Sequence, residues 1–429
     1  MRDMKESGHP WLGTIPEHWD VVYPKMLFSQ RKDRAQPGER QLTASQQHGV
    51  VFQDEYMEMT GSRVVIVEKD FDILKHVEAG DFVISMRSFQ GGIEYSENTG
   101  CISSAYVMLI PDKGYVHNRY FKWLLKSSTY INALQSTSNL VRDGQAMRFA
   151  NFIKVWLPLV PLDEQMAIAE ILDHKCTQVD TLIANVQAQI EKLKAYKQSV
   201  ITEVVTKGLD SSVPMKDSGV AWLGEIPEHW SISRIGRHAD VILGKMLCST
   251  QLTPEHTLEP YYCAANIHFD GVDMSVRKEM WFNEAEKQQY LVSTGDLLVV
   301  EGGAGAGGCA IIQNAETPMY VQNSIMILRQ PSAFDVRYFR YLLESLVNRG
   351  YVDLVCNKAT IPHFTKDKLS SVPYPILPLP EQCQISDYLD EKCTQIDQLI
   401  AIKQKKIDKL NEYKKSLIYE YVTGKKEVS

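Results

Sequence analysis

The sequence lacks the patterns that mark a secreted, membrane-spanning or zinc-binding protein. No stretch approaches the roughly 18 apolar residues that a membrane span requires, and the opening MRDMKESGHP has no apolar segment of a secretory signal. The eight cysteines are scattered, without a Cys-x-x-Cys pair or a Cys/His metal spacing. We therefore expect a cytoplasmic chain with reduced cysteines, no bound metal and no membrane partner.

Catalytic motifs are missing as well. The chain has no GxxxxGK[ST] loop for ATP, no Asn/Asp-Pro-Pro-aromatic motif of amino-methyltransferases and no His-Glu-x-x-His. A GxGxxG pattern does occur at Gly303, Gly305 and Gly308, but the CAIIQN that follows indicates a strand, where a dinucleotide site needs a helix. We predict a tight loop between strands there, and a chain without a catalytic site or a cofactor of its own.

Bulk charge does not favour a protein that binds nucleic acid alone. The net charge is −7, whereas such proteins are usually basic. This balance still allows a basic groove on an acidic body, or basic partner subunits. The length of 429 residues suits two to four structural units rather than one core.

What the sequence does contain is an internal repeat. The opening motif Met4–Trp19 returns as Met215–Trp230 and differs at only four positions. A longer repeat joins Pro158–Lys207 to Pro375–Gly424, where 27 of 50 residues are identical. Because internal repeats fix the architecture of a chain, we read the order motif, globule, helix twice.

The longer repeat has the pattern of a helix that packs against a partner. Apolar residues recur at heptad spacing from Leu172 to Val200, and again from Leu389 to Leu417, where Lys403 interrupts the row. Glu164 and Glu381 fall in the first turn, where a negative charge is favourable. About forty residues at 1.5 Å each make helices of roughly 60 Å.

We predict an α+β fold in which two globules are separated by two long antiparallel helices that form a coiled coil. The domains are 1–157, 158–208, 209–374 and 375–429, related by an internal pseudo-two-fold axis. Each globule is expected to contain short strands, then one helix (118–135 and 335–356) and then a polar loop. A coiled coil between two separate chains is the alternative.

WLGxIPEHW twice, two divergent globules, and two helices introduced by PL-x-PL-x-EQ together resemble the specificity subunit of type I restriction–modification enzymes. The resemblance covers essentially the whole chain. It implies a non-catalytic protein in which each globule, a target-recognition domain, reads one half of a split, asymmetric double-stranded DNA sequence. A coiled-coil scaffold without sequence-specific DNA binding is the alternative reading.

The resemblance also implies partners. The long helices would set the spacing between half-sites and dock two methyltransferase subunits, and motor-nuclease subunits would join the full complex. Adenine methylation and ATP-dependent cleavage, with S-adenosylmethionine, ATP and Mg²⁺, would then lie on those partner subunits.

Polar residues in the loops of the globules are the candidate DNA contacts, because arginine and glutamine side chains can bond base edges while lysine and threonine bond phosphates. The alternatives are a solvated turn around Arg87 and Gln90, surface charges for residues such as Arg148 and Lys366, a strand end for Gln322 and Asn323, and a tight loop between strands for the glycines. The candidates are Arg87, Ser88, Gln90, Arg142, Gln145, Arg148, Gly303, Gly305, Gln322, Asn323, Lys358, Thr360, His363 and Lys366.

A second group of residues is expected to hold the frame or meet a partner. The tryptophans of the opening motif are expected to be buried anchors that fix each globule to a helix end, with a place at the methyltransferase interface as the competing idea. His18 and His229 are expected to cap or pack locally. The frame residues are Trp11, Trp19, Trp222, Trp230, Glu164, Gln165, Glu381 and Gln382.

Overall fold

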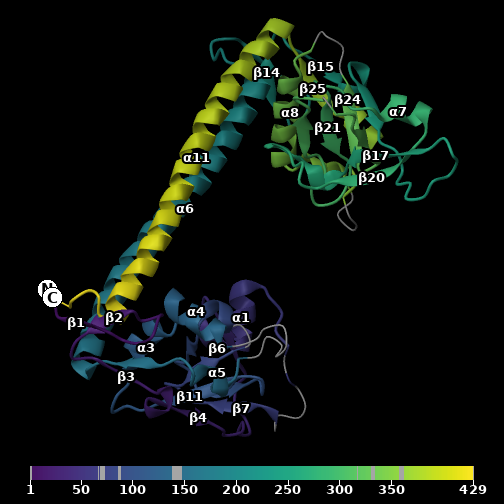
Figure 1. Cartoon of the computed structure of the whole chain (residues 1–429). Coiled ribbons are helices and arrows are strands. Elements are labelled where there is room, and N and C mark those ends of the chain that lie inside the picture. The colour runs from purple at the N-terminus through teal and green to yellow at the C-terminus, as the bar shows by residue number, and fades with distance from the viewer. Residues whose placement is uncertain are drawn as a thin grey trace. The chain divides into compact units, whose positions relative to one another are not determined.

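A computed structural model describes residues 2–65, 67, 73–85, 88–137, 147–315, 317–329, 334–356 and 362–428. The chain divides into two compact units (Figure 1). The first unit is Met1–Gln187 with Gln404–Ser429, and the second is Ala188–Lys403. Within the described ranges, no helix is both long enough and apolar enough to cross a membrane.

The globular part of the first unit, which we call the first head, runs from Asp20 to Leu159, where its first and last strands pair. The opening motif forms its own two-stranded ribbon before it. The elements are β1 (Met4–Glu6), β2 (Thr14–Pro16), β3 (Asp20–Val22), β4 (Phe28–Arg31), β5 (Leu42–Ser45), β6 (Gly49–Phe52), α1 (Gln53–Thr60), β7 (Lys75–Val77), β8 (Phe82–Ile84), α2 (Ser88–Gly91), β9 (Glu94–Tyr95), β10 (Gly100–Ile102), β11 (Val107–Pro111), α3 (Asn118–Leu124), α4 (Ser128–Ser136), α5 (Phe149–Phe152) and β12 (Leu157–Leu159).

The second head runs from Ser231 to Ile376, and its first and last strands also pair. Its elements, with the repeated ribbon before it, are β13 (Met215–Asp217), β14 (Glu225–Pro227), β15 (Ser231–Arg234), β16 (Asp240–Leu243), β17 (Thr257–Tyr262), β18 (Ile267–His268), β19 (Gly271–Val272), β20 (Lys278–Phe282), α7 (Glu284–Tyr290), β21 (Leu297–Val300), β22 (Cys309–Ile311), β23 (Tyr320–Val321), β24 (Ile325–Arg329), α8 (Val336–Asn348), α9 (Tyr351–Val355), α10 (Lys366–Ser371) and β25 (Pro373–Ile376).

Both heads contain the same four-stranded antiparallel sheet. Its order is β4-β11-β8-β9 in the first head and β16-β24-β21-β22 in the second. A buried aspartate precedes the central strand in each: Asp81 accepts from Arg31 at 2.6 Å, and Asp296 accepts from Arg329 at 2.6 Å. The arginine comes from β4 in one head and from β24 in the other. The two heads therefore have the same buried Asp–Arg pair although the arginine lies on different strands.

The single helix expected in each globule is wrong, because each is broken into two. In the first head Ser127 has an extended backbone, and its Oγ accepts from the amide of Tyr130, which starts α4 as a new helix. In the second head Gly350 takes a φ of 73°, which ends the run of α8 before α9 begins.

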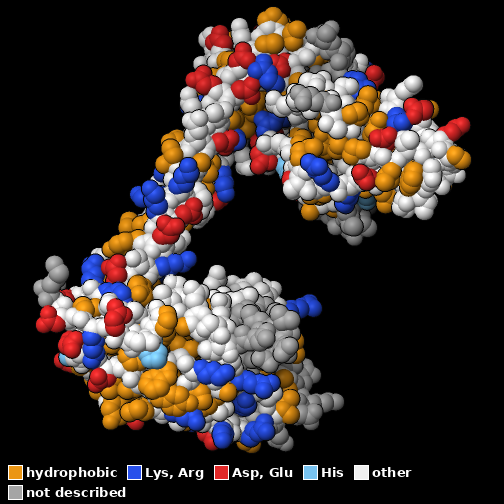
Figure 2. Space-filling view, viewed as in Figure 1, with side chains coloured by type: hydrophobic (Ala, Val, Ile, Leu, Met, Phe, Trp, Pro, Cys, Tyr) orange, Lys and Arg blue, Asp and Glu red, His pale blue; other side chains and the backbone are white. Residues whose placement is uncertain are grey.

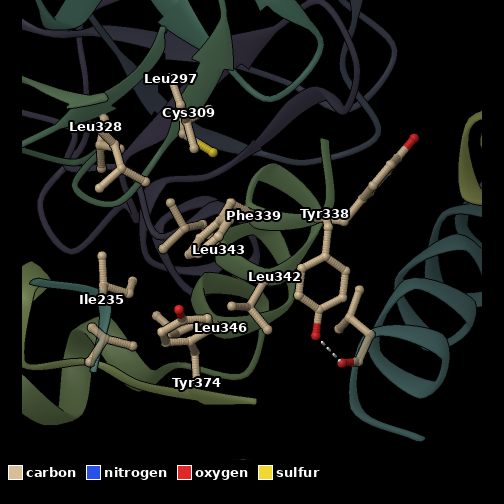
Figure 3. Close-up of a cluster of buried hydrophobic side chains, with 14 of the residues drawn as sticks. Ile235, Leu297, Cys309, Leu328, Tyr338, Phe339, Leu342, Leu343, Leu346 and Tyr374 are labelled. Atoms are coloured by element: carbon tan, nitrogen blue, oxygen red, sulfur yellow. Dashed lines mark hydrogen bonds between the residues drawn. The ribbon is translucent and has the colours of Figure 1, made fainter. Parts of the chain in front are cut away.

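The core of the second head is built on one face of α8 (Figure 3). Tyr338, Phe339, Leu342, Leu343 and Leu346 are all fully buried, and they project from α8 toward the sheet and toward the long helix α6. The spacing of these residues places them on one side of the helix. This burial fixes the orientation of α8 within its unit.

The long helices are α6 (Leu162–Lys207) and α11 (Leu379–Val422), and they pack together (Figure 1). In the second unit, Lys403 Nζ donates to Gln189 at 2.6 Å and Lys197 Nζ donates to Asp397 at 2.7 Å. As the residue number rises along α6, the number of its partner on α11 falls, so the pairing is antiparallel. The predicted pairing within one chain is confirmed.

The equivalent contact recurs in the first unit. Lys414 donates to Asp180 at 2.7 Å, and these residues are the repeat counterparts of Lys197 and Asp397. Lys403, which interrupts the apolar row, is tolerated because its ammonium group reaches across to a glutamine of the other helix.

Candidate nucleic-acid interface and the joints that hold it

The opening motif is joined to α6 in the first unit through Glu164. Trp19 Nε1 donates to Glu164 at 3.1 Å, and His18 Nε2 lies 2.5 Å from its other oxygen. Arg2 also bonds this carboxylate. Burial raises the pKa of Glu164, but the hydrogen bonds from His18, Arg2 and Trp19 outweigh burial and hold the pKa below its usual value. The first-turn carboxylate is therefore charged and fully engaged.

The second unit repeats this joint with Glu381. Trp230 Nε1 donates to Glu381 at 3.0 Å, and His229 Nε2 lies 3.0 Å from the other oxygen. Gly208, just beyond the end of α6, lies against the indole of Trp230. The carboxylates that we assigned to a favourable first turn thus also bind residues about 150 positions away in the sequence.

The glutamine that follows each glutamate fastens the long helix to the head. Gln165 is fully buried; its side chain accepts from the amide of His117 at 2.7 Å and donates to the carbonyl oxygens of Tyr115 and Val160 at 2.7 and 2.8 Å. His117 is the residue immediately before α3. One side chain therefore connects α6, the strand region before it and the start of a head helix.

Gln382 makes the corresponding connections in the second unit. It accepts from the amide of Asp335 at 3.1 Å and donates to the carbonyl oxygen of Leu377 at 2.9 Å. Asp335 caps α8. The Glu-Gln pair of each repeat is thus a bracket in which Glu holds the opening motif and Gln holds the head.

In each unit a buried tyrosine of the head is hydrogen-bonded to the last turn of a long helix, which is α11 in the first unit and α6 in the second. Tyr120 of α3 donates to the carbonyl oxygen of Val422 at 2.7 Å, and Tyr338 of α8 donates to that of Val205 at 3.0 Å (Figure 3). These carbonyl groups belong to the last turn of a helix, where no intrahelical donor remains. The tyrosines therefore satisfy groups that would otherwise be buried without a partner.

The four tryptophans of the motif take structural places. Trp19 and Trp230 are fully buried, and Trp222 is 7% exposed. Trp11 is half-buried, and its indole donates to the carbonyl oxygen of Trp156 at 3.1 Å. These contacts favour the role of anchors over that of a partner surface, most clearly for Trp19 and Trp230.

In the second head the glycine-rich segment connects β21 to β22, which are antiparallel neighbours, as predicted from the absence of a following helix. Gly303 donates its amide to the carbonyl oxygen of Pro362 at 3.1 Å, and His363 Nδ1 lies 3.1 Å from Glu301. Gly305 is exposed at the tip. The hairpin thereby meets the loop that contains His363, which is 58% exposed.

The segment around Gln322 and Asn323 lies beside the same hairpin. Glu301 donates its amide to the carbonyl oxygen of Ser324 at 2.8 Å. The side chains of Gln322 and Asn323 are hydrogen-bonded to each other at 2.7 Å, and Ser324 Oγ donates to Gln322 at 2.5 Å. Three segments singled out from the sequence therefore converge, and Glu301 connects them. The sequence reading missed Glu301 and Ser324, although both adjoin the residues that it selected.

The first head places its candidates around α4. Ser88 is buried and its Oγ accepts from the amide of Ser85 at 2.8 Å, so it stabilises the start of α2 and we leave it out of the interface. Gln90 is exposed on α2, which packs against α4. Arg148 is exposed at the start of α5, which is tied to the end of α4 by a hydrogen bond from Asn151 to Thr137 at 3.0 Å.

Of the remaining candidates, one lies on a short helix of the second head and the others fall outside the described residues. Lys366 is exposed at the first position of α10. In the described part of the chain, no group of three or more His, Cys, Asp or Glu side chains is placed to hold a metal ion. The predicted contacts that fall outside the described residues are Arg87, Arg142, Gln145, Lys358 and Thr360.

Comparisons with known proteins connect this geometry to a family. Residues 227–423 match a family model described as the type I restriction modification DNA specificity domain. The MjaX and MjaVIII specificity subunits of type I restriction enzymes from Methanocaldococcus jannaschii are 23% and 22% identical to the chain. Each alignment covers 96% of this chain, and it covers 95% and 93% of those proteins respectively.

Solved structures share the fold. A chain from a structural study of complex assembly and conformational transition of the type I R-M system has a TM-score of 0.69 at 15% identity, over 95% of this chain and 98% of the other. The crystal structure of the HsdS subunit from Thermoanaerobacter tengcongensis has a TM-score of 0.52 at 16% identity, over 96% and 98%. The predicted fold class is confirmed.

Proposed function

Because the chain belongs to the family of type I restriction–modification specificity subunits, we propose that its two heads read the two halves of one split, asymmetric DNA target. The chain is the DNA specificity subunit of such a system, and the catalytic activities lie on other subunits. Two different heads on one non-catalytic chain would allow it to select two different half-sites.

One observation supports this proposal above the others: equivalent hairpins of the two heads have unlike sequences. The connection from β8 to β9 contains SMRSFQGG, and the connection from β21 to β22 contains EGGAGAGG. The brackets at Glu164 and Glu381 are the same in both units. A constant frame with variable tips is what a reader of two different half-sites requires.

The second head offers the best described reading surface. His363, Gln322 and Asn323 present donors and acceptors around the glycine hairpin, and such groups can bond base edges in the major groove. Glycines at the tip let a backbone approach a duplex closely. On this head Lys366 supplies a further contact, to a phosphate.

The first head has its own proposed contacts. Gln90 would bond a base edge, and Arg148 would bond a phosphate.

The long helices are proposed to set the spacing between half-sites and to dock two methyltransferase subunits, with motor-nuclease subunits completing the complex. S-adenosylmethionine, ATP and Mg²⁺ would act on those subunits, and this chain would hold no cofactor. We keep the division into domains 1–157, 158–208, 209–374 and 375–429 for this purpose.

A head exchange tests the function. The second head, 231–376, is replaced by the corresponding segment of the MjaVIII relative, the chain is co-expressed with its methyltransferase, and methylated adenines are mapped across the genome. We expect one half of the target to change while the other half and the spacing stay the same. The reciprocal exchange of 20–159 is the control and should change the other half. A target that changes in both halves would contradict the proposal, and binding without sequence selectivity would favour a scaffold.

A further inference from the structure

The imidazole of His363 is held at one nitrogen by a carboxylate. His363 Nδ1 lies 3.1 and 3.3 Å from the two oxygens of Glu301. Nε2 has no hydrogen-bond partner in the part of the chain that the structure describes, and the side chain is exposed in the second head. One ring nitrogen is therefore fixed by the protein, and the other is available to a ligand.

Both residues are also fixed through their backbones. The amide of Glu301 donates to the carbonyl oxygen of Ser324 at 2.8 Å, and its carbonyl oxygen accepts from the amide of Phe364 at 2.6 Å. Lys368 Nζ donates to the carbonyl oxygen of His363 at 2.7 Å, and the neighbouring Phe364 is fully buried. These contacts join two segments that are 62 residues apart in the sequence, so the protein itself holds the pair in place.

Gly302 leaves the space that this pair needs. Gly302 and His363 face each other in an antiparallel β-bridge. A Cβ added at Gly302 would lie 3.0 Å from His363 Nδ1 and 3.3 Å from Cε1, closer than the roughly 3.5–4.0 Å of an ordinary van der Waals contact. A larger residue at this position would push the ring away from Glu301.

The chemistry of the pair fixes which ring nitrogen carries the proton. A carboxylate accepts hydrogen bonds and does not donate them, so the hydrogen between Glu301 and Nδ1 belongs to the imidazole. A neutral imidazole has a single N–H, so its Nε2 is then an acceptor. In the major groove the donors are the amino groups of cytosine and adenine, whereas guanine and thymine present only acceptors. A neutral His363 held in this way therefore matches cytosine or adenine.

The sequence of the first head does not repeat the pair. GDLLVVE of the second head ends in Glu301, whereas the matching GDFVISM of the first head ends in Met86. The residue before the phenylalanine of the polar loop is His363 in the second head and Arg148 in the first. Methionine is at most a weak acceptor, and arginine only donates. The second head thus presents an acceptor where the first presents donors, as two unlike half-sites require.

We propose that Glu301 is a positioning residue that keeps the proton of His363 on Nδ1, so that Nε2 accepts a hydrogen bond from the amino group of a cytosine or an adenine. This proposal rests on the proposed function and adds to it the identity of one recognised group. Figure 2 shows basic and acidic side chains interspersed on the visible face of the second head. This mixture favours recognition through single directed hydrogen bonds, since base contacts are what specify a sequence.

The first step of the test finds the base pair that His363 reads. The full chain, assembled with its methyltransferase subunits, binds a library of random DNA duplexes, and the bound DNA is sequenced. We expect His363→Ala to lose the preference at one base pair of one half-site, and the control His268→Ala, at an exposed position of the same head, to keep it. Binding is measured at about pH 8.5, because an imidazolium would donate from both nitrogens.

The second step removes the amino group. Purine in place of adenine, or pyrimidin-2-one in place of cytosine, lacks the exocyclic amino group at that base pair. We expect the wild-type complex to bind the altered duplex about tenfold more weakly than the preferred one, and His363→Ala to bind both duplexes equally. Glu301→Lys, whose ammonium group can only donate, should shift the proton to Nε2 and abolish the difference. Glu255→Lys, the same change at an exposed position of the same head, should retain it.

Glu301→Gln is a second variant, in case Glu301→Lys does not fold. Its side chain can bond Nδ1 through either its oxygen or its nitrogen, so the difference between the duplexes should fall to about threefold. Equal binding of both duplexes by the wild type, an unchanged difference in a folded Glu301 variant, or a His363→Ala variant that keeps every base preference would overturn the role of the pair and leave the proposed function intact. A wild-type complex that selects no DNA sequence would overturn the proposed function, and the role of the pair with it.

Discussion

Replacing Gln165 by leucine should loosen the first unit more than the same change at Gln382 loosens the second. Gln165 connects to three backbone groups and Gln382 to two, and both side chains are almost entirely buried. Leucine has a similar size but no polar atoms, so it leaves these groups without partners. At about 1–3 kcal/mol for each unpaired buried group, and allowing for the gain from burying leucine, we expect losses of about 3–5 and about 2–3 kcal/mol.

Hydrogen exchange followed by mass spectrometry can measure these losses separately, because each unit opens with its own free energy. In Gln165→Leu, peptides from α3 should lose protection by about 100-fold or more, while those from α8 keep the wild-type value. Gln382→Leu should show the reverse with a smaller loss. Gln198→Leu, at an exposed position of α6, is the matched control. Equal losses of protection in both units, or a Gln165 variant with the same protection as the control, would refute the role of these glutamines in fastening the long helices to the heads.

Three further outcomes are expected. His363→Ala should weaken DNA binding by the assembled complex about tenfold in fluorescence anisotropy, while His268→Ala, an exposed histidine elsewhere on the same head, should not. Burial raises the pKa of Glu94 to about 7. The folded unit therefore keeps a proton that the unfolded chain loses from about pH 4.5, so the free energy of unfolding should fall by about 2–3 kcal/mol between pH 4.5 and 7. Glu94→Gln should abolish this decline in hydrogen-exchange measurements. Gly424→Ala should lower the melting temperature more than Gly208→Ala, since both have positive φ but only the first would force a Cβ to within 2.5 Å of a proline.

The frame was predictable because it is written twice. Matching segments with heptad spacing predicted α6 and α11 and their antiparallel pairing, and the structure confirms both. The first-turn position of Glu164 was also evident. Its bonds to Trp19 and His18 were not, because a contact across about 145 residues depends on how the chain folds back. A pattern of helix spacing reports which face is apolar and does not report what lies on that face.

The surfaces that we propose to read DNA were predictable only in outline. Polarity selected the glycine hairpin, Gln322 and His363, and the structure brings these three segments of the second head together. Ser88 was selected by the same reasoning, yet its side chain is buried and its hydroxyl accepts from the backbone amide of Ser85. Serines that face solvent and serines that bond their own backbone both occur in polar turns, and only the local backbone path decides which way the hydroxyl points. The break between α3 and α4 escaped notice for the same reason.

The division of the chain into units has a consequence for its synthesis. The second unit is one continuous stretch, whereas the first is completed by residues 404–429, whose Leu417, Tyr421 and Val422 lie in the core of the first head. Since domains fold as units while the chain is being made, the head that is translated first cannot complete its core until residues 404–429 have been made. A chain that ends between Lys403 and Leu417 would have a complete second unit and an incomplete first core. The core of the first head is therefore completed by residues that follow both heads in the sequence.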